Sequence, residues 1–239
     1  SKTLTFVNKC FNRWEKLYFN KGAWLEAVIH NGRVASTHKQ VNYETACREG
    51  GVFEEVVKKY GIPNQNFLHC TRELKENPIL SYMESLGEIK GHIKNKEFVS
   101  STYETWIGIR ADEPRRLGGN MDGVQKKVYP LNTLGIVKQT VLDFWEGMPF
   151  DLDIPEHLGN CVDCHKKSEN KLFKVARDMG VQAFDFPAHL DVMYDTVNAQ
   201  VKDGVLVPRK RFRGHRSTIE LIALFKESKF NPKDYDVET

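Results

Sequence analysis

Residues 105–116 read Thr-Trp-Ile-Gly-Ile-Arg-Ala-Asp-Glu-Pro-Arg-Arg, and this stretch does most to decide the fold. Its first five residues, 105–109, are mostly apolar and predict a short strand. The carboxyl end of that strand delivers Arg110, Asp112 and Glu113 into a loop. Ligands of open α/β sheets bind at the carboxyl ends of the strands. We therefore expect this loop to line a binding site.

Patterns typical of helices and strands alternate around this stretch. Apolar residues recur at helical spacing in 2–20, 52–60, 136–145 and 172–179, while the apolar run 24–30 is typical of a buried strand. This alternation predicts an α/β fold with a parallel sheet and flanking helices.

Capping patterns place the remaining helices. Asn77 and Pro78 suit an N-cap and first helical position, so the Cys70 motif is expected just before a helix start. Residues 186–201 are predicted to be helical, and Ser217 with Glu220 has the spacing of a capping box that opens a last helix. The cysteines at 161 and 164 are expected in a loop at a helix N-terminus.

Bulk composition narrows the class of protein. The 239 residues carry 35 basic and 32 acidic side chains, a net charge of +3, which does not by itself imply attraction to nucleic acid. No apolar run approaches the ~18 residues of a membrane span, and the first residues do not have the layout of a signal peptide. A soluble, cytoplasmic protein is expected. With five cysteines, two of them in a Cys-x-x-Cys pair, metal or redox chemistry is favoured over a disulfide framework.

Two groups of basic side chains suit anionic ligands. Arg72 and Lys75 lie three apart before the expected helix start, and Arg110, Arg115 and Arg116 follow the expected strand. Guanidinium and ammonium groups bind phosphate or sulfate oxygens. The plainer interpretation is that Arg115 and Arg116 are solvated while Arg110 forms an ordinary ion pair with Asp112 or Glu113.

The cysteine motif has the spacing of a metal knuckle. Lys166, Lys167 and His165, beside Cys161 and Cys164, are expected to lower the thiol pKa values and favour thiolates. Two cysteines cannot complete a tetrahedral site. Cys70 is the natural third ligand, and His69 or His165 is a candidate fourth. Redox-active or free thiols, and plain packing, are the alternatives.

A dense basic run covers residues 208–216 and contains one aromatic side chain. Such a run is more often a solvated loop than a reader of bases. If it binds a ligand, a nucleotide phosphate or a tRNA backbone is the candidate.

Three blocks in order, residues 70–75, 106–116 and 159–168, resemble the C-terminal two-thirds of a phosphoadenosine-phosphosulfate (PAPS) reductase-like protein of the adenine-nucleotide α-hydrolase group. The resemblance implies a Rossmann-like parallel sheet, an ATP or PAPS-like nucleotide with Mg²⁺, and a nucleotide and substrate pocket lined by the segment from Gly108 to Arg116. It also implies an iron–sulfur cluster as a candidate cofactor. A cluster held by three cysteines, with one iron left open, would resemble the clusters of some tRNA-thiolation relatives.

The resemblance assigns roles to particular residues. Asp112 and Glu113 would orient substrate or Mg²⁺, and Cys70 would act in catalysis. The cysteines Cys70, Cys161 and Cys164 would hold an iron–sulfur cluster or zinc, or handle sulfur directly. The nucleotide and substrate would be bound by Thr71, Arg72, Lys75, Gly108, Arg110, Arg115, Arg116, Lys166 and Lys167.

The chain departs from the family at both ends. The Ser-Gly-Gly-x-x-Ser phosphate loop is absent, so residues 1–150 are expected to form an incomplete α/β domain, with the helical, Cys-x-x-Cys-containing region 151–239 packed on it. The loop is expected on a partner chain, on a removed segment, or to have been lost. A Glu-Cys-Gly-like tail is also absent, which argues against reduction of PAPS itself.

Three functions are compatible with this pattern. The first is an enzyme, or the larger portion of one, that binds an adenine nucleotide and activates or transfers a sulfur or adenylyl group. The second is a non-catalytic binding or assembly module, with zinc as a staple. The third is a sulfur transferase acting on tRNA. A homo-oligomer is compatible with each of them.

Overall fold

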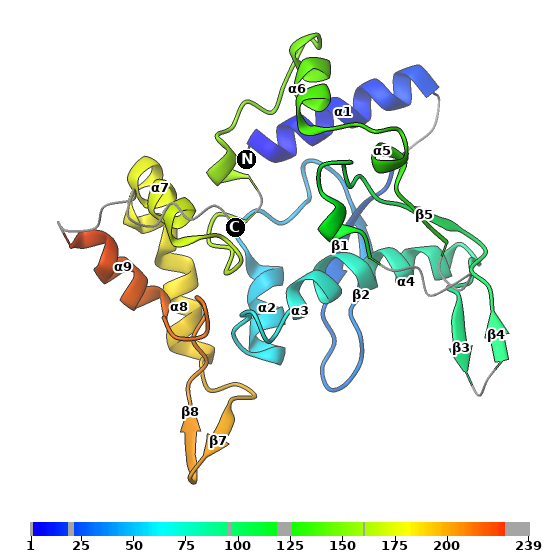
Figure 1. Cartoon of the computed structure of the whole chain (residues 1–239). Helices are drawn as coiled ribbons and strands as arrows, with labels where there is room; N and C mark the ends of the chain where they lie inside the picture. The colour runs from blue at the N-terminus through cyan, green and yellow to red at the C-terminus, as the bar shows by residue number, and fades with distance from the viewer. Residues whose placement is uncertain (1, 19–21, 95–96, 119–125, 160, 228–239) are drawn as a thin grey trace. The chain divides into compact units, whose positions relative to one another are not determined.

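The computed structural model describes residues 2–18, 22–94, 97–118, 126–159 and 161–227 (Figure 1). The chain divides into two compact units: unit 1 is Ser1–Ala23 with Ile79–Leu152, and unit 2 is Trp24–Pro78 with Asp153–Thr239. One boundary falls at 152/153, close to the expected residue 150, whereas the segment 24–78, which was expected in the N-terminal domain, groups with the C-terminal region.

The elements of each unit alternate between helices and short strands. Unit 1 contains α1 (Lys2–Tyr18), most of α4 (Asn77–Ser85), β3 (His92–Lys94), β4 (Glu97–Val99), β5 (Glu104–Trp106), the 3-10 turn Pro114–Arg116, β6 (Lys126–Val128), α5 (Pro130–Thr133) and α6 (Lys138–Glu146). Unit 2 contains β1 (Trp24–Val28), β2 (Thr37–Val41), α2 (Gly51–Tyr60), α3 (His69–Thr71), the π-helical segment Arg72–Glu76, the start of α4, the 3-10 turns Glu156–Leu158 and Val181–Phe184, α7 (Glu169–Met179), α8 (Asp185–Tyr194), β7 (Gln200–Lys202), β8 (Val205–Val207) and α9 (Thr218–Lys226).

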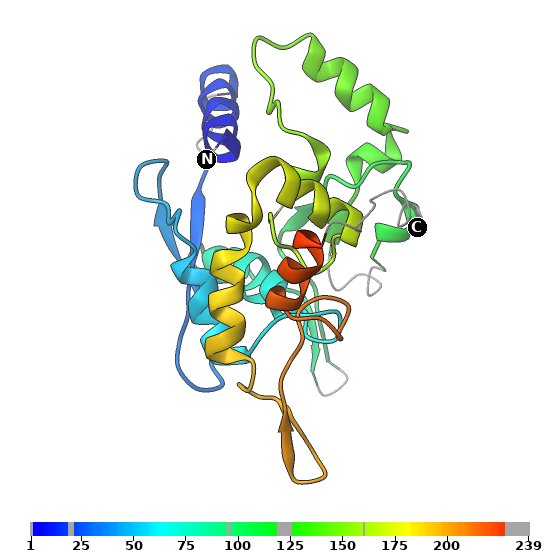
Figure 2. The ribbon, with the colours of Figure 1, turned by 90° about the vertical axis from the view of Figure 1, so that its left-hand side faces the viewer.

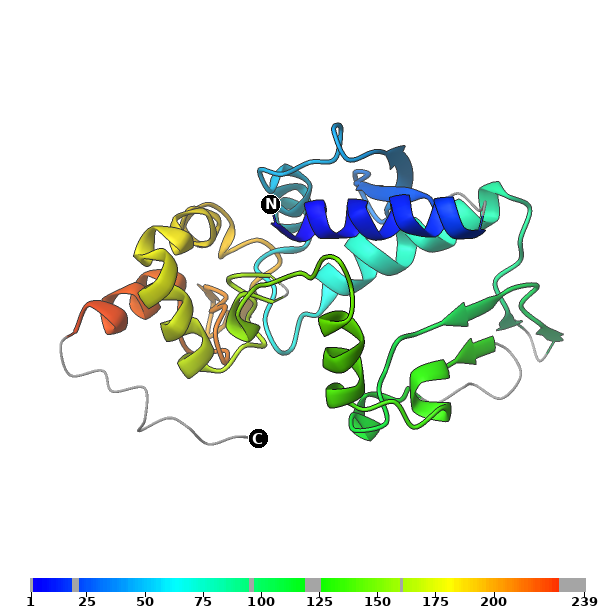
Figure 3. The same ribbon diagram turned by 90° about the horizontal axis from the view of Figure 1, so that it is seen from above.

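The sheets are small. Over the described residues the strands form four two-stranded sheets: β1–β2, β3–β4 and β7–β8 are antiparallel, and β5–β6 is parallel (Figure 3). The fold is therefore mixed α/β. The expectation of a parallel sheet holds for β5 and β6, whereas β1 pairs with a following strand that the sequence did not reveal. A short connection brings β2 back alongside β1, and such connections favour antiparallel pairing.

Two buried clusters hold unit 2 together. One joins α7, the turn 181–184, Phe212 and α9 through Leu172, Val175, Ala176, Phe184, Phe212 and Leu221. The other joins Val57 and Ile62, in and just after α2, to Leu190 of α8. All three of those side chains are fully buried, and each such burial stabilises the fold by about 1.5–3 kcal/mol. This second cluster explains why the segment 24–78 belongs with the C-terminal region.

The expected helix over 186–201 is only half correct. Helix α8 ends at Tyr194, and Gln200 begins the β7–β8 hairpin, which projects from the rest of unit 2 (Figure 2). Asn198, Asp203 and Gly204 all have positive φ, a conformation that turns favour and a continuing helix does not allow.

The Cys70 motif lies inside a helix, not before one. Helix α3, the π-helical segment Arg72–Glu76 and α4 follow one another without a break, so Asn77 and Pro78 do not start a helix. Proline has no N–H to give to a preceding carbonyl. The backbone adapts by widening: the Asn77 N–H bonds to the carbonyl of Arg72, five residues back, and a π-turn of this kind is a known response to strain in a helix.

A buried serine completes this widened turn. The Ser36 hydroxyl donates to the Glu73 carbonyl at 2.6 Å, and the Glu73 carboxylate accepts from the Ser36 N–H at 3.1 Å. Both residues are buried. The Glu73 carbonyl lies five residues before Pro78, which cannot donate to it, so Ser36 meets a need that the proline creates.

Aromatic contacts join the helices of unit 1. Phe6 of α1 lies edge-on to Trp145 of α6 at 5.0 Å between ring centroids and to Phe150 at 6.0 Å. Neither α1 nor α6 contains a fully buried residue. In the part of the chain that the structure describes, no helix is both long and apolar enough to cross a membrane.

Replacing Ser36 with alanine is expected to lower the free energy of unfolding by about 1–2 kcal/mol, because the Glu73 carbonyl would be left buried without its partner. Urea denaturation measures the effect. Ser85→Ala is the matched control, since that hydroxyl bonds to the Tyr82 carbonyl on an exposed helix end and its loss should change stability by less than about 0.5 kcal/mol. Equal effects of the two changes would contradict the role given to Ser36.

Candidate functional site

Cys70, Cys161, Cys164 and Lys75 all belong to unit 2, where the charges of the other three residues act on the Cys161 thiol. Cys161 and Cys164 lie in a turn in which the Cys164 N–H donates to the Cys161 carbonyl at 3.3 Å, just before α7. The Cys161 thiol interacts electrostatically with Cys70, Cys164 and Lys75. The predicted placing of the pair before a helix is confirmed. We call these four residues the thiol cluster.

The predicted thiolate character of Cys161 is wrong. Burial of the thiol raises the pKa of Cys161 although the residue as a whole is exposed, and Asp163, Cys164 and Cys70 raise it further. Lys75 acts in the opposite direction but does not outweigh them. The basic neighbours in sequence were expected to lower this pKa; the carboxylate and the thiols around Cys161 are what the fold adds.

Lys167 binds the backbone around the loop that carries Cys161 and Cys164, which we call the cysteine loop. Its ammonium donates to the carbonyl of His157 at 2.5 Å and to that of Val162 at 3.4 Å. Burial lowers the pKa of Lys167, while Cys164, Cys161 and Asp163 raise it. Lys167 is therefore engaged with the backbone of its own loop, whereas Lys166 is exposed.

Arg211 also contacts the cysteine loop, through Asp163. Its Nε donates to Asp191 Oδ1 of α8 at 3.0 Å, and its Nη1 lies 3.6 Å from Asp163 Oδ2 in the cysteine loop. The Arg211 side chain is 2% exposed. Asp191 also accepts from the Thr218 N–H at 2.8 Å and hydroxyl at 2.7 Å, at the first residue of α9. One buried guanidinium thus joins the cysteine loop to two helices.

The basic run is partly internal, although Pro208, Arg213, Gly214 and His215 are exposed. Arg209 and Arg211 are buried, Lys210 pairs with Glu220, and Arg216 pairs with Glu169. The Arg209 guanidinium lies 3.7 Å over the Phe67 ring and donates to the Tyr60 carbonyl. The expected solvated loop is therefore wrong for these residues. Sequence alone could not reveal the carboxylates and carbonyls that bind these basic side chains.

His69 and His165, the candidate fourth ligands, are both buried and neutral. Burial lowers the pKa of each to about 4, with Lys166 and Arg211 contributing for His165. The Nε2 atom of each makes no hydrogen bond. Among the described residues, no three His, Cys, Asp or Glu side chains are arranged to hold a metal ion. The cysteines as placed do not fit the predicted metal or iron–sulfur site.

The two cations of the Cys70 motif, Arg72 and Lys75, differ in their contacts. Arg72 Nε donates to the Glu73 carboxylate at 2.8 Å, and its guanidinium lies 5.5 Å over the Tyr60 ring. Lys75 and Thr71 are exposed, and no described acidic group pairs with Lys75. Lys75 is therefore the cation of this motif that remains available to an anion.

Unit 1 carries the other predicted residues. Arg110 follows the carboxyl end of β5 and pairs with Asp112 at 2.9 Å and Glu113 at 3.5 Å. Glu113 also pairs with Arg116 at 2.6 Å, and Asp112 accepts from the Lys138 N–H at the start of α6. The hydrogen bond from Arg110 lowers the pKa of Asp112, and that from Arg116 lowers the pKa of Glu113.

These contacts match the plainer interpretation for Arg110, which forms ion pairs, and differ from it for Arg116, which pairs with Glu113. Arg115 agrees with that interpretation. Arg115 is exposed and no acidic group in the described ranges pairs with it. Near Gly108 there is room: an added Cβ would meet only Leu131, at 3.7 Å.

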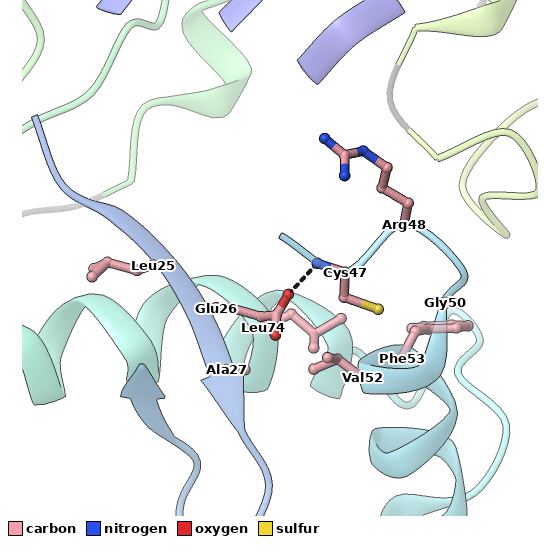
Figure 4. Close-up of a pocket in the computed structure, with 9 residues that line it drawn as sticks. All are labelled: Leu25, Glu26, Ala27, Cys47, Arg48, Gly50, Val52, Phe53 and Leu74. Carbon is pink, nitrogen blue, oxygen red and sulfur yellow. Dashed lines mark hydrogen bonds between the residues drawn. The ribbon is translucent and has the colours of Figure 1, made fainter. Parts of the chain in front are cut away.

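A pocket of about 360 Å³ in unit 2 was missed by the sequence analysis (Figure 4). It lies between β1, the residues before α2, and Leu74, and it is lined by Leu25, Glu26, Ala27, Cys47, Arg48, Gly50, Val52, Phe53 and Leu74. Backbone N–H groups of Glu49, Val52 and Gly51 lower the pKa of Cys47. Gly50 and Gly51, which follow Cys47 by three and four residues, were the sequence feature that could have indicated this lowered pKa, since amides at a helix start stabilise anions.

Comparison with known proteins connects the chain to a phage protein. The uncharacterized nin region protein ORF290 of Escherichia phage lambda is 40% identical over 126 residues, which cover 53% of this chain and 38% of that protein. The matched part is thus well under two thirds of the phage protein. No protein-family model and no solved structure matches the chain.

Arg211→Ala is expected to lower the free energy of unfolding by about 3–5 kcal/mol, because it leaves Asp191 and Asp163 without their buried partner. Arg213→Ala is the matched control in the same basic run, since Arg213 is exposed and its loss should change stability by less than about 0.5 kcal/mol. Chemical denaturation measures both. Equal, small effects would show that the run is solvated.

The thiols are expected to differ in their rate of alkylation. At neutral pH Cys47 should react with iodoacetamide faster than Cys161, because the thiolate is the nucleophile and the two pKa values are shifted in opposite directions. Peptide mapping over a pH series should place the midpoint for Cys47 below that of a free cysteine, and the midpoint for Cys161 above it. The reverse order would contradict the described surroundings of both thiols.

Proposed function

We propose that the chain is a PAPS reductase-like protein, or the larger portion of one, that binds an adenine nucleotide and activates or transfers a sulfur or adenylyl group. The observation that carries this proposal is the thiol cluster. Cys70 and Lys75 come from one predicted motif and Cys161 and Cys164 from another, and they interact within unit 2. An electrostatic interaction between two motifs that are distant in sequence supports a common function.

The chemistry that we propose uses the thiols directly. Cys161 and Cys164, two thiols held in one turn, can reduce a disulfide or persulfide co-substrate. With a disulfide, one cysteine thiolate attacks a sulfur of the co-substrate, the first thiol leaves and a mixed disulfide forms; the second cysteine then attacks the cysteine sulfur of that bond and releases the other thiol. With a persulfide, the thiolate attacks the outer sulfur, the parent thiol leaves and the cysteine carries the persulfide; the second cysteine then attacks the cysteine sulfur and releases hydrogen sulfide. The cysteines end as one disulfide, and the co-substrate leaves as two thiols, or as a thiol and hydrogen sulfide. The two electrons and two protons come from the cysteine thiols.

The surroundings act on this step in both directions. The attacking group is a thiolate, so the raised pKa of Cys161 means that a base must first take its proton, while the positive charge of Lys75 favours ionisation. Asp163 opposes ionisation and is itself held by Arg211. Cys70, which also interacts electrostatically with Cys161, is a third thiol for exchange.

The nucleotide part of the proposal relies on unit 1. A Rossmann-like arrangement is part of the proposal, and the parallel pair β5–β6 with Arg110 after its carboxyl end supports it. In this proposal the phosphate loop is provided by a partner chain or a further segment, and Mg²⁺ would be held with the nucleotide phosphates by Asp112 or Glu113.

A non-catalytic binding module is the second candidate. The observation in its favour is that Arg110, Asp112, Glu113 and Arg116 already neutralise one another. A sulfur transferase acting on tRNA receives less support, because Arg209 and Arg211 of the basic run are buried.

The test is oxidation of the reduced protein by glutathione disulfide, followed by mass spectrometry. Wild type should form an internal Cys161–Cys164 disulfide, whereas Cys161→Ser and Cys164→Ser should stop at a mixed disulfide with glutathione. Cys10→Ser is the control, since Cys10 lies in α1 of unit 1, and it should behave as wild type. Calorimetric titration with ATP and PAPS should give binding. No internal disulfide, no nucleotide binding and one stoichiometric zinc would establish the binding module instead.

A further inference from the structure

Trp106 is an aromatic side chain that is largely exposed to solvent at the end of a strand. It is the last residue of β5 and is 67% exposed. Its indole Nε1 donates to Glu104 Oε2 at 2.9 Å, so its polar atom is satisfied while the ring faces stay free. This bond restrains the ring, and a restrained ring loses little entropy when a ligand stacks on it.

The ring lies at the carboxyl end of the parallel pair. Trp106 is opposite Val128 of β6, and Glu104 is opposite Lys126. Side chains two apart on a strand share a face, so Trp106 and Lys126 lie on the same face of the pair. This is the end of the strands from which Arg110 and the following loop continue. Ligands of parallel sheets collect at that end.

Lys126 is the cation that the strand register puts on this face. It is the first residue of β6, opposite Glu104 at the amino end of the pair, and it is exposed. Within the described ranges no acidic group forms an ion pair with it, whereas Arg110 and Arg116, in the loop after β5, are paired with Asp112 and Glu113. A flat apolar ring beside unpaired positive charge complements a ligand with an aromatic base and an anionic tail.

We propose that the indole of Trp106 is the stacking platform for the base of an adenine nucleotide, with Lys126 bound to one of its phosphates. This inference rests on the proposed function and deepens it, because it places base recognition on β5 and β6, outside the residues expected to bind the nucleotide. A stacked base contributes about 1–3 kcal/mol. Loss of the ring should therefore weaken binding roughly 5- to 150-fold.

The experiment compares AMP with ribose 5-phosphate, which lacks the base. Calorimetry on the full chain should show AMP binding weakened at least ~5-fold in Trp106→Ala, retained in Trp106→Phe, and unchanged in Trp14→Ala, another exposed tryptophan of unit 1. Binding of ribose 5-phosphate should not change in Trp106→Ala. Lys126→Gln should weaken both ligands and reduce the dependence of binding on salt.

The outcomes separate this inference from the proposed function. If wild type and Trp106→Ala bind AMP equally, the stacking role is wrong and the proposed function stands. If Trp106→Ala weakens AMP and ribose 5-phosphate alike, Trp106 acts on the fold of the site and the stacking role is also wrong. If wild type binds no adenine nucleotide at all, both proposals fail together.

Discussion

The buried pairing of Arg211 with Asp191 and Asp163 is the interaction on which unit 2 depends. A guanidinium removed from water costs several kcal/mol unless carboxylates surround it, and Arg211 has two. Asp191 in turn bonds to the first residue of α9, while Asp163 belongs to the cysteine loop. The position of the thiols is therefore fixed by the same contacts that join α8 to α9.

Local patterns were enough to predict the long helices and the capped start of α9. Apolar spacing predicted α1, α2 and α7, and the Ser217–Glu220 capping box of α9 is present in full. The turn of the Cys-x-x-Cys pair before α7 was also predicted. These features depend on residues close in sequence, and their physical causes can be identified without knowing the rest of the fold.

The features that sequence could not predict depend on distant partners. The basic run looked solvated because its carboxylates, Asp191 and Asp163, lie on other elements. The helix through Pro78 looked like a helix start because the hydroxyl that satisfies Glu73 comes from Ser36. The pKa of Cys47 depends on amide groups that point at it only once α2 has formed, so the residue type alone does not indicate it.

The distribution of partners among the cations decides where an anion can bind. Arg72, Arg110 and Arg211 are each paired with a carboxylate. An incoming phosphate would have to displace that carboxylate. Lys75, Arg115 and Lys126 are exposed and, among the described residues, have no acidic partner, so an anion at these groups exchanges only with water. The unpaired cations are for this reason the better candidates: Lys75 in unit 2, and Arg115 and Lys126 in unit 1.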